Sequence, residues 1–299
     1  DHWQHRFDWR ALEARLNAYP QFTTEIDGQQ IHFLHVRAPQ PSGTALILTH
    51  GWPGSVVEYL DVISPLTAAG YDLVIPSLPG FGFSGPTTEA GWDVHRTARA
   101  WVELMHRLGY ERYGAVGNDG GSMISPRSVG STRSTSSACT SRSCSRSRPA
   151  TPAELADLTA DEQAAIEHLQ WFWENLGAFN VMLSQSPQTV AHALADSPPA
   201  GLLGWNGQLL VGLDDDFVVA NAAVYWFTRT TGSSVRFYRE MAHSTTHPSG
   251  PTTVPTALAG STNDFLSIRR FVDRDHANVV RWNVYDTPPA TTPPTRRPT

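Results

Sequence analysis

The feature that most restricts the fold is the pentapeptide Gly-Asn-Asp-Gly-Gly at positions 117–121, directly after the apolar run 112–117. Such a run predicts a buried strand. Glycines on both sides of one functional side chain permit the sharp, strained turn that joins a strand to a helix. The side chain at the turn is the carboxylate of Asp119, which can attack a carbon bearing a good leaving group and form an alkyl–enzyme ester. These five residues alone fit a plain Asp-Gly turn with a helix cap equally well.

Strand-like and helical patterns alternate around this turn. Thr44–His50 and Tyr71–Leu78 are short apolar runs that read as buried parallel strands. The segment Arg96–Leu108 places its apolar side chains at helical spacing. Towards the end of the chain, Val254–Gly260 and Val279–Tyr285 are strand-like again. The alternation predicts the α/β class, with a mostly parallel sheet flanked by helices.

The stretch from Ala153 to about Ser244 differs from both sides because it is helical and aromatic. We interpret it as a helical cap inserted into the α/β core. The predicted organisation is an N-terminal segment at 1–42, a first part of the core at 43–152, the cap at 153–250 and the last part of the core at 251–299.

Composition excludes several classes of protein. The chain has 299 residues, 40% of them hydrophobic, and a net charge of −6. A mildly acidic chain lacks the clustered cations that nucleic-acid binding needs, and no apolar run approaches the roughly 20 residues of a membrane helix. Cys139 and Cys144 are the only cysteines, which favours a reducing, cytoplasmic setting. The chain begins without Met, so we expect that a natural N-terminal piece is missing.

Two more loops follow predicted strands. In His50-Gly51-Trp52-Pro53-Gly54, a turn of small residues can aim the backbone N–H of Trp52 at an oxyanion, alongside the N–H of Gly120. The second loop is Leu-Pro-Gly-Phe-Gly-Phe-Ser at 78–84. His50 and Pro53, together with Phe179 of the predicted cap, are the candidate substrate-binding residues.

At this point the sequence resembles the epoxide hydrolases of the α/β-hydrolase superfamily, and among them the microsomal type in a bacterial form. The resemblance covers most of the chain and is carried by the motifs at 8–10, 22–28, 50–54, 78–84, 117–121, 196–198, 236–238 and 254–256. It implies an α/β-hydrolase fold with a helical cap and an N-terminal lid segment. It also implies hydrolysis of an epoxide to a vicinal diol.

The resemblance further implies residue roles. Asp119 is the nucleophile, Tyr238 donates a hydrogen bond to the epoxide oxygen, and Asp264 orients a histidine that activates water. No metal and no organic cofactor are implied. The aromatic cap suggests a bulky or aromatic epoxide, in secondary metabolism, as the small-molecule partner. Neither nucleic acid nor a membrane is expected, and a homodimer is left open. The alternatives to these roles are structural: Tyr238 is then an ordinary core aromatic residue, and Asp264 is the N-cap of a helix.

The sequence departs from the family pattern at two places. The family's second cap tyrosine corresponds to Phe179, which cannot donate a hydrogen bond. The family's histidine belongs soon after the last strand, where this chain has only the Thr- and Pro-rich tail 287–299. The sole histidine after Asp264 is His276, whose neighbours indicate a solvated loop and which is a weak match for the base.

A frame shift is one explanation of the tail and of the Ser- and Arg-rich segment 127–148. All 22 basic residues are Arg, a bias typical of GC-rich, actinobacterial-like genomes. In the shifted frame, 133–140 yields E-H-V-V-G-V-H, a plausible strand, and 289–295 yields G-H-Y-A-A-H, which contains the missing histidine. The alternative is a genuine disordered linker and tail on a catalytically impaired binding protein. A dehalogenase with the same Asp nucleophile is the remaining enzymatic alternative.

Overall fold

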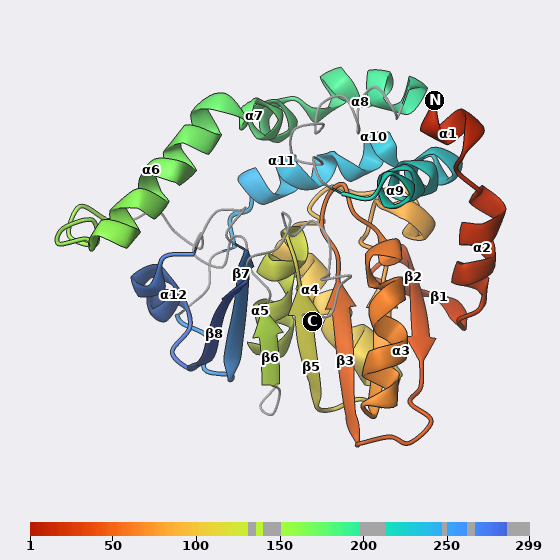
Figure 1. Ribbon diagram of the computed structural model, residues 1–299, viewed down its shortest axis with the longest axis horizontal. Coiled ribbons are helices and arrows are strands. Elements are labelled where there is room, and N and C mark those ends of the chain that lie inside the picture. The colour runs from red at the N-terminus through yellow and green to blue at the C-terminus, as the bar shows by residue number, and fades with distance from the viewer. Residues whose placement is uncertain (131–135, 140–150, 198–212, 247–249, 262–266, 286–299) are drawn as a thin grey trace.

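The computed structural model describes residues 1–130, 136–139, 151–197, 213–246, 250–261 and 267–285. Its centre is an eight-stranded sheet with the order β1-β2-β4-β3-β5-β6-β7-β8 (Figure 1). The strands β3 to β8 run parallel, whereas β1 and β2 are antiparallel to their neighbours. The strands are Gln21–Ile26, Gln29–Val36, Thr44–Thr49, Tyr71–Pro76, Tyr113–Gly117, Ser136–Cys139, Thr256–Ser261 and Val279–Tyr285.

Helices cover both faces of this sheet because its central strands are apolar on both sides. The buried side chains of Ile47, Val74 and Ala115 belong to one core cluster. Trp101 of α4 is fully buried in the same cluster, and its indole N–H donates to the hydroxyl of Thr49 at 3.1 Å. The helices beside the sheet are α3 (Leu60–Ala68), α4 (Val94–Arg107), α5 (Gly120–Gly130) and α12 (Arg269–Asp275).

A second group of helices lies across the end of the sheet where the parallel strands finish (Figure 1). These cap helices are α6 (Ala160–Asn175), α7 (Ala178–Gln185), α8 (Pro187–Asp196), α9 (Asp215–Thr228), α10 (Thr231–Ser234) and α11 (Arg236–Ala242). They stand over the loops at 50–54 and 78–84, which also leave the carboxyl ends of strands. The candidate site therefore lies between the sheet and the cap.

The N-terminal helices α1 (His2–His5) and α2 (Trp9–Asn17) run along the side of the molecule up to α9 (Figure 1). The ring of Trp9 lies 4.6 Å from that of Phe227, and Nε2 of His2 lies 2.6 Å from a carboxylate oxygen of Asp216. The N-terminal segment thus braces one cap helix.

Most predicted elements agree with the structure to within two or three residues at each end. The face-value interpretation of 127–148 as a disordered linker is wrong in part. Helix α5 continues to Gly130, and residues 136–139 form β6, which pairs parallel with both β5 and β7. This strand overlaps the segment where the shifted frame yields one. The rest of that segment and the tail 287–299 lie outside the described residues.

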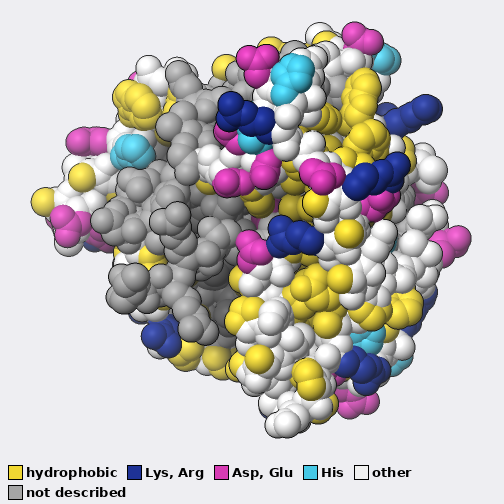
Figure 2. All heavy atoms as spheres, turned by 45° about the vertical axis from the view of Figure 1, so that its right-hand side comes forward, with side chains coloured by type: hydrophobic (Ala, Val, Ile, Leu, Met, Phe, Trp, Pro, Cys, Tyr) yellow, Lys and Arg dark blue, Asp and Glu magenta, His cyan; other side chains and the backbone are white. Residues whose placement is uncertain are grey.

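Figure 2 turns the side with α2 and α9 forward and shows acidic and basic side chains interspersed among hydrophobic ones. No helix in the part of the chain that the structure describes is both long and apolar enough to cross a bilayer. The same residues contain no cluster of three or more His, Cys, Asp or Glu side chains suited to a metal ion.

Candidate active site

The nucleophile candidate stands on a strained turn. Asp119 is the second residue after β5 and directly precedes α5, and its φ of 47° lies in the left-handed region. The flanking glycines are required for close approach. A Cβ at Gly117 would lie 2.1 Å from the carbonyl oxygen of Gly121, and a Cβ at Gly121 would lie 2.0 Å from that of Thr49. Only glycine lets the strand, the turn and β3 approach so closely, so the predicted elbow is present.

The loop 50–54 meets this elbow through a backbone hydrogen bond. The N–H of Trp52 donates to Oδ1 of Asp119 at 2.9 Å. A Cβ at Gly51 would lie 2.2 Å from the same oxygen, so glycine is needed here as well. The bond orients the carboxylate and leaves Oδ2 as the oxygen that can attack. Gly120, the other predicted oxyanion donor, is buried at the start of α5.

Tyr238 of α11 reaches the same place from the cap. Its side chain is 6% exposed, and its ring meets Trp52 at 5.5 Å and Phe179 at 5.9 Å, edge-on to both. Phe179, at the start of α7, stacks on Trp52 at 6.2 Å. Burial raises the pKa of Tyr238 well above its ordinary value, and the nearby charge of Asp119 raises it further. The phenol therefore stays protonated, and so remains a donor, across the neutral pH range.

His50 is fully buried and is held by backbone groups at both ring nitrogens. The N–H of Leu78 donates to Nε2 at 3.2 Å, so Nδ1 carries the proton and donates to the carbonyl of Gly51 at 2.9 Å. Burial lowers its pKa to about 4. This histidine thus ties the loop 50–54 to the loop 78–84, and its contact with substrate stays a prediction. The same holds for Pro53, which is half-buried.

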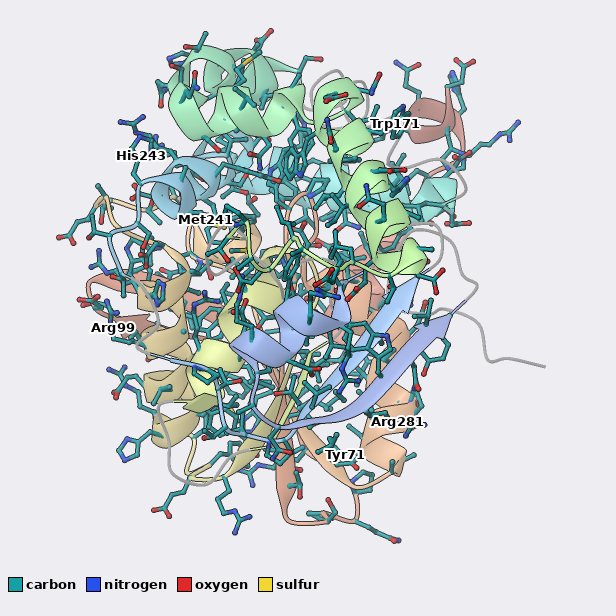
Figure 3. All side chains as sticks on the ribbon, turned by 90° about the vertical axis from the view of Figure 1, so that its left-hand side faces the viewer. Tyr71, Arg99, Trp171, Met241, His243 and Arg281 are labelled. Atoms are coloured by element: carbon teal, nitrogen blue, oxygen red, sulfur yellow. The ribbon has the colours of Figure 1, made fainter. Side chains whose placement is uncertain are left out.

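The histidine that would activate water is not supplied by His276. That side chain is 5% exposed rather than in a solvated loop, and its Nδ1 lies 2.7 Å from the hydroxyl of Thr252. It precedes β8, whose first residue pairs with the first residue of β7. Because β5 to β8 are parallel, His276 lies at the amino-terminal ends of these strands and Asp119 at their carboxyl-terminal ends. The two side chains are therefore at opposite ends of the strands. His243, exposed after α11, points outward in Figure 3. Asp264 lies outside the described residues.

Sequence reasoning missed three buried residues with polar groups beside the elbow, namely Glu58, Tyr59 and Tyr225. Asn118 of the elbow bonds to Glu58 and Tyr59, both in the short 3₁₀ turn Val56–Tyr59. Tyr225 of α9 donates from its hydroxyl to the carbonyl of Gly54 at 2.7 Å. Burial, then the charge of Glu58, raises the pKa of Tyr225 well above its ordinary value. A single acidic residue inside the apolar run 56–60 was the signal that could have indicated this network.

The arrangement combines a carboxylate nucleophile, a backbone donor on one of its oxygens and a protonated phenol, all under an aromatic cap. These groups suit attack on an electrophilic carbon whose leaving group is an oxygen that needs a proton donor. They come from the turn after β5, the loop after β3 and helix α11, which are far apart in the sequence.

Comparison with known proteins identifies the family. Residues 1–59 match the family described as "Epoxide hydrolase N terminus", and residues 44–177 match "alpha/beta hydrolase fold". The chain is 30% identical to "Epoxide hydrolase 1" of Sus scrofa. The alignment covers 89% of this chain and 68% of that protein. The chain belongs to the epoxide hydrolase family.

Solved structures agree with this assignment. The epoxide hydrolase of Aspergillus niger superposes with a TM-score of 0.79 at 27% identity, covering 95% of this chain and 77% of that one. The juvenile hormone epoxide hydrolase of Bombyx mori gives a TM-score of 0.77 at 25% identity, over 95% and 74%. Both the resemblance and the α/β-hydrolase fold predicted from the sequence are confirmed. The chain spans between 60% and 69% of the length of the curated relatives that it matches.

Proposed function

We propose that this member of the family opens an epoxide to a vicinal diol through an ester on Asp119. One observation carries the proposal. The carboxylate of Asp119 is held by the Trp52 N–H, on a strained elbow, close enough to the buried phenol of Tyr238 for its charge to raise the pKa of that phenol.

In the first step, Oδ2 of Asp119 attacks one epoxide carbon and the C–O bond of the ring breaks. The electron pair of that bond goes to the epoxide oxygen, which receives a hydrogen bond and then the proton from Tyr238. Ester formation removes the charge of Asp119, so one of the two causes that raise the pKa of Tyr238 disappears as the reaction proceeds. The phenol of Tyr238 is thus a stronger acid when the alkoxide forms than it is in the free enzyme.

In the second step, water attacks the ester carbonyl carbon. Oδ1, already bonded to the Trp52 N–H, becomes the oxyanion, and the N–H of Gly120 is the second donor in this proposal. When the acyl C–O bond breaks, the departing diol oxygen takes the proton that the base removed from the water. The second proton of the water returns to the Tyr238 phenolate, which restores the Asp119 carboxylate. The water needs a base, and we assign it to the family histidine of the shifted-frame tail, oriented by Asp264. A chain with the tail as written would stop at the ester.

The substrate class follows from the side chains that surround Asp119. The rings of Trp52, Phe179 and Tyr238 contact one another, and a Cβ at Gly120 would lie 2.8 Å from the ring of Phe237. Apolar, aromatic surroundings favour an epoxide with a bulky or aryl substituent. The cytoplasmic location and the homodimer stay predictions.

Tyr238 also favours an epoxide over an alkyl halide as the substrate. A departing halide needs no proton, whereas an epoxide oxygen does. The test uses styrene oxide and 1-bromohexane as probes with the purified chain. We expect an adduct, or diol, from styrene oxide at a rate at least a hundred times that of bromide release. Faster release of bromide would favour the dehalogenase alternative, and reversible binding of styrene oxide without reaction would favour the binding protein.

A further inference from the structure

A buried carboxylate lies between the two loops that form the site. Glu58 is 4% exposed, and its Oε2 accepts a hydrogen bond from Nδ2 of Asn118 at 2.8 Å. Asn118 directly precedes Asp119, and its Oδ1 accepts a hydrogen bond from the hydroxyl of Tyr59 at 2.8 Å. Two consecutive residues of one turn therefore hold both polar ends of the asparagine amide.

The other oxygen of Glu58 approaches the loop 50–54. A Cβ at Gly54 would lie 1.4 Å from Oε1, so only a glycine leaves room for the carboxylate. The carbonyl oxygen of Gly54 accepts the hydrogen bond from Tyr225 on the opposite side of the chain, in the cap. One carboxylate thus touches both the loop that carries the Trp52 N–H and the elbow that carries the nucleophile.

We propose that Glu58 is a positioning residue for the ester-forming step, and that it acts through Asn118. The inference rests on the proposed function. A non-glycine residue at a φ of 47°, such as Asp119, is strained and persists only when its surroundings over-determine it. The Glu58–Asn118 bond joins Asn118, which precedes Asp119, to the 3₁₀ turn that follows the loop 50–54. It thereby keeps Oδ1 of Asp119 within hydrogen-bond distance of the Trp52 N–H.

A purely structural role for Glu58 predicts a different effect of its removal. Loss of a structural group lowers stability but leaves the folded fraction with its normal rate of ester formation. Loss of a positioning group slows ester formation in folded protein while the substrate concentration at half-maximal rate stays within about threefold, because binding of the apolar substrate depends on the cap.

The experiment is a double-mutant cycle on ester formation. Single-turnover reaction with styrene oxide is quenched at a series of times, and the adduct on the peptide containing Asp119 is measured by mass spectrometry. We expect Glu58→Ala and Asn118→Ala each to slow adduct formation about 10- to 100-fold, the effect of losing a hydrogen bond to a charged group. Because both break the same bond, the double variant should be no more than about threefold slower than the slower single variant.

Two further variants sharpen the cycle. Glu58→Gln keeps an acceptor oxygen for Asn118, so it should recover at least tenfold of the rate lost in Glu58→Ala. If Glu58→Ala does not fold, Glu58→Leu replaces it in the cycle, because leucine also lacks an acceptor for Asn118 but fills more of the space. Glu103→Ala is the matched control, because this glutamate of α4 has 44% of its side chain exposed and pairs only with Arg107 among the ion pairs of the described residues. It should react at the wild-type rate.

Additive losses in the double variant, or an unchanged rate in folded Glu58→Ala, would overturn the role of Glu58. Failure of the wild-type chain to form an adduct on Asp119 would instead overturn the proposed function, and the role of Glu58 with it. The two failures are distinguished by the wild-type reaction alone.

Discussion

Replacing Tyr238 by phenylalanine should remove acid assistance while leaving the fold of the site intact. The ring contacts at 5.5 Å to Trp52 and 5.9 Å to Phe179 do not depend on the hydroxyl. Stability should therefore change by no more than about 1 kcal/mol, the net worth of one hydroxyl hydrogen bond.

The rate effect should be much larger. A positioned general acid contributes about 10²- to 10⁴-fold, and each tenfold corresponds to about 1.4 kcal/mol of activation free energy. Phe179, which the sequence resemblance matches to the family's second cap tyrosine, has no hydroxyl, so Tyr238 is the only phenol of this predicted pair. We therefore expect Y238F to slow ester formation by about 10³-fold, equivalent to about 4 kcal/mol. Adding Phe179→Tyr to Y238F should restore about tenfold, since it returns a phenol next to Trp52.

The assay is single-turnover formation of the Asp119 adduct with styrene oxide, at pH 7 and at several substrate concentrations. Tyr71→Phe is the control, because Tyr71 begins β4 at the end of the molecule opposite the cap (Figure 3). Adduct formation by Y238F within about threefold of wild type would refute the assignment of Tyr238 as the acid, as would an equal loss in the Tyr71 variant.

Three more predictions follow from the structure. Gly51→Ala places a Cβ 2.2 Å from Oδ1 of Asp119, so adduct formation should fall at least 100-fold while the protein still folds; a normal rate would contradict the close contact. Burial lowers the pKa of His32 and His50 to about 4, so stability is full above about pH 6.5 and declines as the pH falls towards 4, by up to about 3 kcal/mol for each histidine. Urea unfolding at pH 7 and pH 4.5 measures this, and a pH-independent free energy of unfolding would contradict it. Peptide mapping beyond Asp286 should yield the shifted-frame peptide with its histidine; the written Thr/Pro peptide would refute the frame hypothesis.

Local patterns were enough to predict most of the fold. The strands at 44–50, 71–78 and 279–285 are recognisable because buried parallel strands are continuous apolar runs. The Asp119 elbow is recognisable because its glycines are adjacent in sequence. Strand β6 at 136–139 was not predictable from the sequence. Its four residues, Ser-Ser-Ala-Cys, are fewer and less apolar than those of a typical buried strand.

The site was predictable only where its residues sit in motifs. Trp52 and Asp119 belong to glycine-rich turns with a recognised mechanical role, and their contact agrees with that role. Glu58 and Tyr225 come from segments that read as ordinary core, and their meeting at Gly54 depends on how the cap packs on the sheet. The burial of His276 depends likewise on the pairing of the loops before β7 and β8.

The most direct test of the account is to locate the covalent adduct. Wild-type protein and Asp119→Asn are incubated with styrene oxide, quenched in acid, digested and mapped by mass spectrometry. The account predicts substrate mass on the peptide that contains Asp119 when the wild type is quenched within its first turnover, and none in the variant. Diol production by Asp119→Asn at the wild-type rate, or an adduct on another residue, would contradict it.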